Sequence, residues 1–144
     1  MTIATAVACA TVGGVFFAFS SFVMAGLRRL PATQGIAAMQ SINVLAVTPV
    51  FMTALFGTAA LSVALAIAEP SGLVLAGAAT YVLGVPGVTM AYNVPRNNAL
   101  ERLDLRAPDA PAAWERYVRE WTAANHVRTL AGIAAAALLC AELA

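Results

Sequence analysis

Residues 1–27, MTIATAVACATVGGVFFAFSSFVMAGL, contain no charged side chain and are followed by Arg28 and Arg29. About 20 consecutive apolar residues are needed for a helix to cross the roughly 30 Å hydrocarbon layer of a membrane. The stretch is therefore long enough to span a bilayer. It has no positively charged start, and its arginines follow the apolar run, so we expect a retained helix and not a cleavable signal.

Three further stretches are long, apolar and almost free of charge. They predict spans at residues 44–68, 73–92 and 121–143. The more polar residues 33–43 are expected to form an amphipathic entry turn before the second span. Residues 93–111 are the only long hydrophilic segment. The sequence thus predicts an all-α fold: a single transmembrane domain over residues 1–144, built as an integral membrane four-helix bundle with its hydrophilic loop between helices 3 and 4.

The composition favours a membrane location. The chain is 61% hydrophobic and 10% charged, with a mean hydropathy of +0.82, whereas soluble domains average about 25% charged residues. A soluble four-helix bundle would need a polar face on every helix, and the first and third predicted helices lack one. The net charge is +1 and no polybasic tract is present, so we expect the lipid bilayer as a partner and no nucleic acid.

The basic residues are distributed unevenly between the two sides of the predicted bundle. The chain has no lysine, so all 8 basic residues are arginines. Those in the predicted first and third loops are Arg28, Arg29, Arg96, Arg102, Arg106, Arg116 and Arg119. Short loops rich in arginine stay in the cytoplasm. We therefore predict a multi-pass protein of the cell membrane with both termini extracytoplasmic and the hydrophilic loop cytoplasmic.

Polar residues of the predicted spans gather at this arginine-rich end. Such side chains are costly in a membrane unless they face the bundle interior and find partners. Spacing of three and four residues places Trp114, Tyr117, Trp121, Asn125 and Arg128 on one stripe of the last helix, and Gln40 and Asn43 on another helix face. The remaining members are Tyr92, Asn93, Asn97 and His126. We expect these residues to form a polar cup with aromatic walls, open to the cytoplasm.

Two prolines lie outward of this cup at similar depth. Each removes one helical hydrogen bond, Pro49 that to the Leu45 carbonyl and Pro86 that to the Val82 carbonyl. Two kinks would widen the cytoplasmic half of the bundle into a pocket. Membrane helices also tolerate proline without any functional role.

The cup residues also allow structural roles. Arg128 either anchors an oxygen-rich ligand or extends to the membrane interface. Asn125 either contacts a ligand or joins two helices. Tyr117 and Trp121 line a ligand site or belong to an interfacial aromatic belt.

His126 is the only histidine of the chain, and its side chain titrates near neutral pH. It is a candidate general base or axial haem ligand, or an incidental interfacial residue. A lone histidine without an acidic side chain inside a span does not make a zinc or di-iron site. Cys9 and Cys140 lie in apolar runs without metal-binding spacing. We expect no metal and no cofactor.

Four motifs, taken in order, resemble a known family. They are Gly14-Val-Phe-Phe-Ala-Phe-Ser-Ser-Phe-Val-Met24; Met39-Gln-Ser-Ile-Asn43 with Pro49-Val-Phe51; Asn93-Val-Pro-Arg-Asn97; and the series Trp114, Tyr117, Trp121, Asn125, Arg128. The resemblance covers nearly the whole chain. It is to the anthrone-oxygenase-like family of small four-span membrane proteins.

The resemblance implies a membrane-embedded, cofactor-independent oxygenase that acts on a lipophilic anthrone-like or phenolic substrate in a cytoplasm-facing pocket. A deprotonated methylene would react with O2 directly, which requires donors for the substrate oxygens and a base. Catalytic roles would then fall to His126, Arg128 and Asn125, with His126 or Tyr92 as the base. The substrate-binding residues would be Gln40, Asn43, Tyr92, Asn93, Asn97, Tyr117 and Trp121.

Other functions use the same residues differently. A non-catalytic binding protein for a hydrophobic small molecule, such as a quinone or lipid, needs the cup but no base. A transporter needs a polar path through both leaflets, and the predicted outer half offers none. A scaffold subunit would have its polar residues fully paired and no cavity. Gly13, Gly14 and Gly57 permit close helix packing within one chain or in a homo-oligomer.

Overall fold

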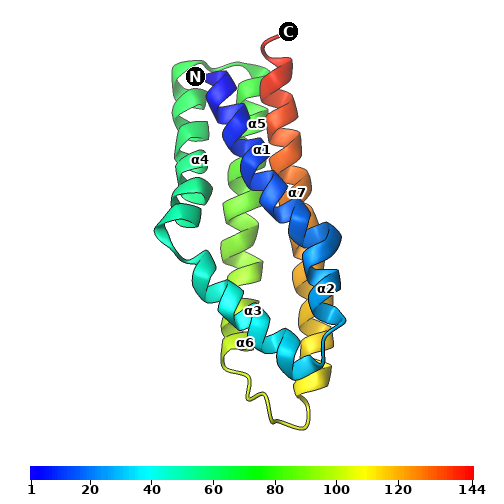
Figure 1. The fold of residues 1–144 in the computed structure, drawn as a ribbon. Helices are drawn as coiled ribbons and strands as arrows, with labels where there is room; N and C mark the ends of the chain where they lie inside the picture. The colour runs from blue at the N-terminus through cyan, green and yellow to red at the C-terminus, as the bar shows by residue number, and fades with distance from the viewer.

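The computed structural model describes residues 1–144 as helices joined by short connections, with no strand. Four helices are long and apolar enough to cross a membrane: Thr2–Arg28, Pro49–Ala68, Gly72–Glu101 and Ala110–Ala141. A fifth helix, α3 (Ala32–Ala46), runs obliquely across the half of the bundle that lies away from the termini (Figure 1). Both termini lie at the same end of the molecule (Figure 1). The predicted all-helical fold with four membrane-competent helices is confirmed.

Two of the long helices contain turns wider than those of an α-helix. The first helix consists of α1 (Thr2–Ala18), η1 (Phe19–Val23) and α2 (Met24–Arg28). The third consists of α5 (Gly72–Val82), η2 (Leu83–Gly87), η3 (Thr89–Asn93) and α6 (Val94–Glu101). Pro86 lies inside the π-helical turn η2, where the wider turn accommodates a residue that lacks a backbone N–H. Pro86 therefore widens the helix without ending it.

The second span starts later than the sequence predicts. Val47 and Thr48 are not helical, and α4 (Pro49–Ala68) begins at the proline. Proline suits the first turn of a helix and forces the residue before it into an extended conformation. Thr48 has φ −71° and ψ 155°. Pro49 thus begins a helix instead of kinking one, and the expected entry turn at residues 33–43 belongs to a separate helix of 15 residues.

The hydrophilic segment predicted at residues 93–111 is largely helical. The third long helix continues beyond the predicted residue 92 to Glu101, so only residues 102–109 connect it to α7 (Ala110–Ala141). α7 has 32 residues and, at about 1.5 Å per residue, is about 48 Å long. It is therefore longer than the roughly 30 Å hydrocarbon layer, and its first turns pack with α2, α3 and α6 beyond the main four-helix region.

The outer surface of the long helices is apolar. Large hydrophobic side chains are exposed on every one of them, including Ile3, Phe22, Val50, Leu83 and Leu130. A soluble monomer rarely exposes apolar surface on this scale. Contact with lipid chains would surround these side chains with an apolar environment, which water does not provide.

The first and last helices approach each other closely in the half of the bundle nearer the termini. A Cβ atom built on Gly132 would lie 2.8 Å from Cα of Gly13, and one built on Gly13 would lie 3.2 Å from the Gly132 carbonyl carbon. Only glycine permits the two backbones to come this near. Gly14, its neighbour in the sequence, faces open space. The glycines predicted to permit close packing thus divide between a contact inside this chain and a free surface.

We predict that Gly132→Val lowers the melting temperature of the detergent-solubilised protein. Overpacking of a close contact typically costs about 1–3 kcal/mol, because the α1 and α7 backbones must move apart. Thermal unfolding followed by fluorescence measures the change. Gly14→Val is the matched control, since a Cβ atom at this position meets no atom within 4 Å. Equal destabilisation by both substitutions would contradict the assigned crossing.

Candidate functional site

Arg128 lies near the middle of the bundle and is only 3% exposed. Its Nη1 donates a hydrogen bond to Thr89 Oγ1 at 3.2 Å, and its Nη2 donates one to Asn125 Oδ1 at 2.8 Å. Its Nε is buried without a partner. The side chain is thus held by α7 itself and by η3 of the third helix, and its Nε is the one nitrogen of the group that makes no hydrogen bond.

Aromatic rings flank this guanidinium group. The Cζ atom of Arg128 lies 4.2 Å from the centroid of the Phe16 ring and 4.8 Å from that of the Trp121 ring. Such contacts stabilise a cation, most strongly where water is excluded. The two ion pairs of the chain lie elsewhere, Arg28 with Glu115 and Arg96 with Glu120. Arg128 therefore has aromatic faces and neutral partners, but no carboxylate.

Asn125 fixes the arginine relative to the first helix. Its Nδ2 donates to the carbonyl oxygen of Phe16 and to Ser20 Oγ, each at 2.7 Å, while its Oδ1 accepts from Arg128. Thr129 Oγ1 lies 3.1 Å from Ser20 Oγ and donates to the Asn125 carbonyl. This cluster joins α7 to η1 and the end of α1. Asn125 is consequently a positioning residue that sets where the guanidinium lies.

Asn97 orients the aromatic wall. Its Oδ1 accepts hydrogen bonds of 2.9 Å from Tyr117 Oη and from Trp121 Nε1. Trp114 stacks on Tyr117 at a centroid distance of 5.7 Å, and Tyr117 stacks on Trp121 at 6.4 Å. The predicted aromatic stripe of the last helix therefore exists, and it is buried inside the bundle and not spread along an interfacial belt.

Two further amides join helices. Asn93 is fully buried and its Nδ2 donates to the Trp121 carbonyl at 3.3 Å. Gln40 Nε2 donates to the Leu100 carbonyl at 2.9 Å, which ties α3 to α6. Neither side chain lines the cavity described next, so both support its walls.

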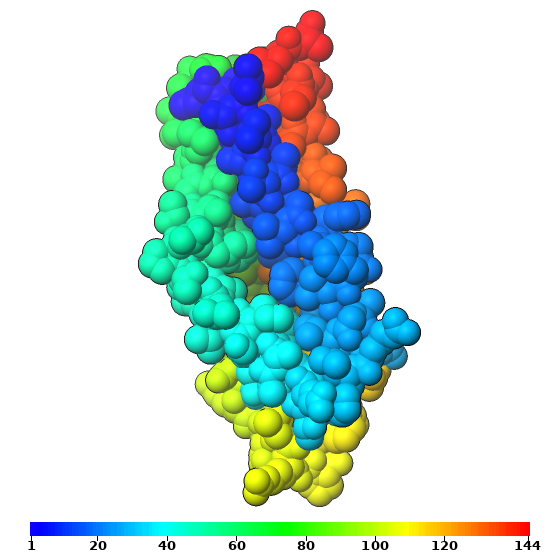
Figure 2. Space-filling view, viewed as in Figure 1, coloured from blue at the N-terminus to red at the C-terminus, as the bar shows by residue number.

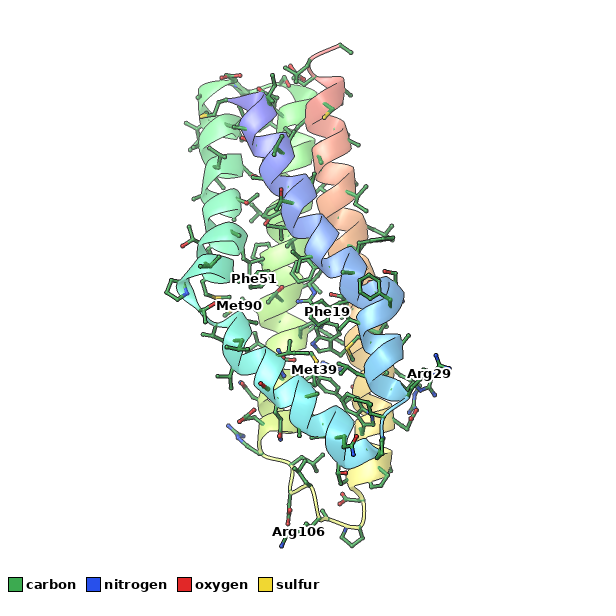
Figure 3. The ribbon with its side chains drawn as sticks, in the orientation of Figure 1. Phe19, Arg29, Met39, Phe51, Met90 and Arg106 are labelled. Carbon is green, nitrogen blue, oxygen red and sulfur yellow. The ribbon has the colours of Figure 1, made fainter.

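A cavity of about 120 Å³ lies between the first helix, α3, α4, the third long helix and α7. Its wall is mostly apolar, and its polar members are Asn43, Thr89, Asn97 and Arg128. Asn43 Nδ2 is buried without a partner. Figure 3 shows Phe19, Met39 and Phe51 around this region, on three different elements. The site thus presents two unpartnered donors, one cationic and one neutral, within an apolar cavity.

The cavity reaches the flank of the molecule. Its wall includes the exposed Val15 and Val47, and Figure 2 shows a hollow between the first helix and the α3–α4 connection. This opening lies among apolar side chains and not at the end that carries the arginine loops. The cavity therefore opens on the flank of the bundle, and a mouth that faces the cytoplasm stays a prediction.

Of the predicted cup residues, only Asn43, Asn97, Trp121 and Arg128 line this cavity, and both candidate bases lie outside it. His126 is exposed on the outer side of α7, with Nδ1 3.0 Å from Ser20 Oγ. Tyr92 is 40% exposed, and its ring lies under the guanidinium of Arg96, with Cζ 3.4 Å from the centroid. Neither is in position to take a proton from a molecule held against Arg128. No three His, Cys, Asp or Glu side chains lie close enough together to hold a metal ion.

Sequence reasoning quoted Phe16 and Phe51 within motifs but gave neither of them a role in the site. Phe16 supplies both a carbonyl acceptor and a ring to the Arg128 cluster, while Phe51 contacts Phe16 edge-on at 6.0 Å. Their local signal is weak, because aromatic residues in spans are usual. The run of four aromatics at residues 16–22 was the available clue.

Comparisons with known proteins agree with the resemblance noted in the motifs. The family model described as anthrone oxygenase matches residues 41–138, which include α3 from its middle, α4, the third helix and nearly all of α7. None of the curated proteins and none of the solved structures compared with the chain gives a match. The matched region contains Arg128 and Asn43. It also contains Asn97 and Asn125, which orient the surroundings of Arg128. The chain belongs to the anthrone oxygenase family.

Proposed function

We propose that this protein is a membrane-embedded oxygenase that binds a lipophilic anthrone-like or phenolic compound in the lateral cavity and oxidises it with O2 without a cofactor. The observation that carries the proposal is Arg128, a buried cation with no acidic partner whose side chain faces an apolar cavity. A flat aromatic anion complements both features of this site, because its negative oxygen would pair with the cation and its ring faces would pack on the apolar wall. Membership of the anthrone oxygenase family favours the same reaction class.

The site suits stabilisation of an oxyanion. Donors fixed in a water-poor site stabilise developing negative charge more strongly than water does, because they need not reorient. In our proposal Arg128 holds the oxygen of the ionised substrate, and Asn43 donates to a second oxygen. Trp121 and Phe16 contact the ring faces. Asn125, Asn97, Asn93, Gln40 and Tyr117 act as positioning residues.

The reaction balances without an added reductant. The ring methylene loses a proton, and the resulting carbanion, delocalised onto the oxygen at Arg128, transfers electrons to O2. The carbon–oxygen bond then forms, the peroxide takes up a proton, and loss of water leaves a new carbonyl. One O2 thus converts one methylene to one carbonyl and one water. The protein favours the first step by holding the substrate as its anion.

The cavity contains no side chain suited to take the methylene proton. His126 and Tyr92, the bases expected from the sequence, lie outside it. We propose that the proton passes to water at the mouth of the cavity, and that the substrates are compounds acidic enough to ionise when Arg128 offsets the charge. This restricts them to enolisable or phenolic ring systems.

Substrate size requires α3 to move. A cavity of about 150 Å³ holds a single benzene ring, and the present one is about 120 Å³. A three-ring substrate therefore needs a wider site. The non-helical Val47 and Thr48 are the pivot at which α3 would swing outward, and the lateral mouth lets the compound enter from the lipid.

The missing base also favours a second function. A non-catalytic binding protein for a quinone or another hydrophobic compound would use Arg128 and Asn43 as hydrogen-bond donors and would need no proton acceptor. It differs from the oxygenase in retaining its ligand unchanged. Turnover in the experiment below separates the two.

We propose further that the protein resides in the cell membrane with both termini extracytoplasmic and the 102–109 connection cytoplasmic. The support is the arginine distribution, since seven of the eight arginines lie in two connections of the bundle or in the helix segments that lead to them. In this orientation the mouth of the cavity faces lipid.

Oxidation of an anthrone by the purified protein in lipid nanodiscs tests the enzymatic role. We expect quinone formation above the spontaneous rate, measured by absorbance and O2 uptake. Arg128→Gln should reduce kcat/KM by about 100-fold or more, the usual cost of removing one oxyanion donor, and Arg128→Lys should restore part of it. Because the substitution to Gln removes a buried charge, thermal stability should not fall in parallel.

Tyr92→Phe is the control for this series, since Tyr92 lies outside the cavity and the variant keeps its contact with Arg96. Equal rates for the wild type and Arg128→Gln would refute the assigned site. Stoichiometric retention of the unchanged anthrone, with weaker binding by Arg128→Gln, would favour the binding protein.

Cysteine labelling in intact cells tests the orientation. In a Cys140→Ser background, Ala144→Cys should react with a membrane-impermeant maleimide, whereas Asp109→Cys should react only after the membrane is permeabilised. Cys9 is buried and contributes little background. The reverse labelling pattern would invert the proposed topology.

A further inference from the structure

A groove runs along the outer surface between the first helix and α7, on the other side of Ser20 from Asn125. It consists of two hollows of about 320 Å³ and 370 Å³ that share Ser20 and His126. We call it the outer groove. Its lower hollow is bordered by Arg28 and Arg119. Its upper hollow is bordered by Phe17, Leu130 and Ile133. The oxygenase proposal uses none of these side chains.

The two ends of the outer groove differ in chemistry. Arg119 is exposed and makes no ion pair, and Arg28 is paired with Glu115 at 2.9 Å on the surface. Thr122 Oγ1, which belongs to the lower hollow, is buried without a hydrogen-bond partner. At the upper end Phe17, Leu130 and Ile133 expose 54%, 68% and 47% of their surface. One end therefore suits an anion, and the other suits a hydrocarbon chain.

The length of the groove matches one leaflet of a membrane. Arg119 and Ile133 are fourteen residues apart on α7, which is about 21 Å along a helix. A bilayer with its headgroups is about 40–45 Å thick, so one leaflet is about half of that. Arg119 and Arg28 then lie at the headgroup level when Leu130 and Ile133 lie among the acyl chains.

We propose that the outer groove binds an anionic phospholipid. Arg28 and Arg119 hold the phosphate headgroup, and one acyl chain lies along Phe17, Leu130 and Ile133. Basic recesses between transmembrane helices are a known way of holding anionic headgroups. A zwitterionic headgroup would bring its ammonium group close to the two arginines, which disfavours it. This proposal does not depend on the oxygenase reaction.

The outer groove and the cavity share a wall. Ser20 Oγ accepts from Asn125, which holds Arg128, and it also lies 3.0 Å from His126 Nδ1 in the groove. A bound lipid therefore packs on the outside of the cluster that positions the arginine. Lipid occupancy should consequently stabilise the contact between α7 and η1.

Native mass spectrometry of the full-length protein from mixed micelles tests the site. The lipid probes are phosphatidylglycerol and phosphatidylcholine with matched acyl chains, offered in equal amounts. We expect the wild type to retain phosphatidylglycerol preferentially. Each arginine near an anionic surface contributes a factor of about five in affinity, so Arg28→Gln with Arg119→Gln should remove most of the preference. Arg102→Gln with Arg106→Gln is the control, because it makes the same charge change in the 102–109 connection.

Two further measurements distinguish a lipid headgroup from free phosphate as the bound anion. Inorganic phosphate at millimolar concentration should neither raise the melting temperature nor displace the lipid, and Leu130→Asn with Ile133→Asn should weaken retention of long-chain phosphatidylglycerol. Arg28→Lys with Arg119→Lys should keep the preference, which excludes misfolding as the cause of its loss. The proposal is wrong if phosphatidylcholine is retained equally, if inorganic phosphate alone reproduces the stabilisation, or if the control pair loses the preference as fully as the groove pair.

Discussion

The arrangement of the bundle interior depends on how a single arginine is accommodated where water is absent. Removing a guanidinium group from water is costly unless its hydrogen bonds and charge are met by the protein. In this chain two aromatic rings face the group, and a threonine and an asparagine accept from it. A carboxylate would neutralise Arg128 fully and leave it inert toward an anionic ligand. The neutral partners keep the charge available, at a cost to stability that the rest of the bundle must offset.

The asparagines extend this arrangement outward. Asn125 uses its oxygen for the arginine and its nitrogen for the first helix, so the position of one helix is transmitted to the guanidinium. Asn97 accepts from two aromatic side chains at once and fixes the wall beside the cavity. Uncharged amides can carry out both tasks in a membrane interior, where an acid would require its own compensation. The unpartnered Asn43 donor is then notable, because every other polar cavity residue has a partner in the protein.

Much of the fold can be predicted from the sequence, and the features that could not be predicted have physical explanations. Charge-free runs predicted four membrane-competent helices, and three- and four-residue spacing placed Tyr117, Trp121, Asn125 and Arg128 on one buried stripe. His126 fell outside this stripe by the same spacing rule, since it is one residue from Asn125 and two from Arg128, and its polarity alone suggested the interior. Proline was ambiguous for the second span: Pro49 fits either a kink or a first turn, and only the packing of α3 decides. The cavity was least predictable, because apolar side chains from five helices form most of its wall.

The close contact of the first and last helices also determines when the site can exist during synthesis. Phe16 and Ser20 are made early, whereas Asn125 and Arg128 are more than a hundred residues later in the chain. Chains are synthesised from the N-terminus at about 5–20 residues per second. The first three spans are therefore complete several seconds before α7, the helix that completes the bundle interior. A ribosome-bound or truncated chain that lacks the last helix has neither the cation nor a closed cavity. The arginine enters the membrane only with the helix that also carries its own hydrogen-bond acceptor, so an incomplete chain never exposes an unpartnered cation to the lipid.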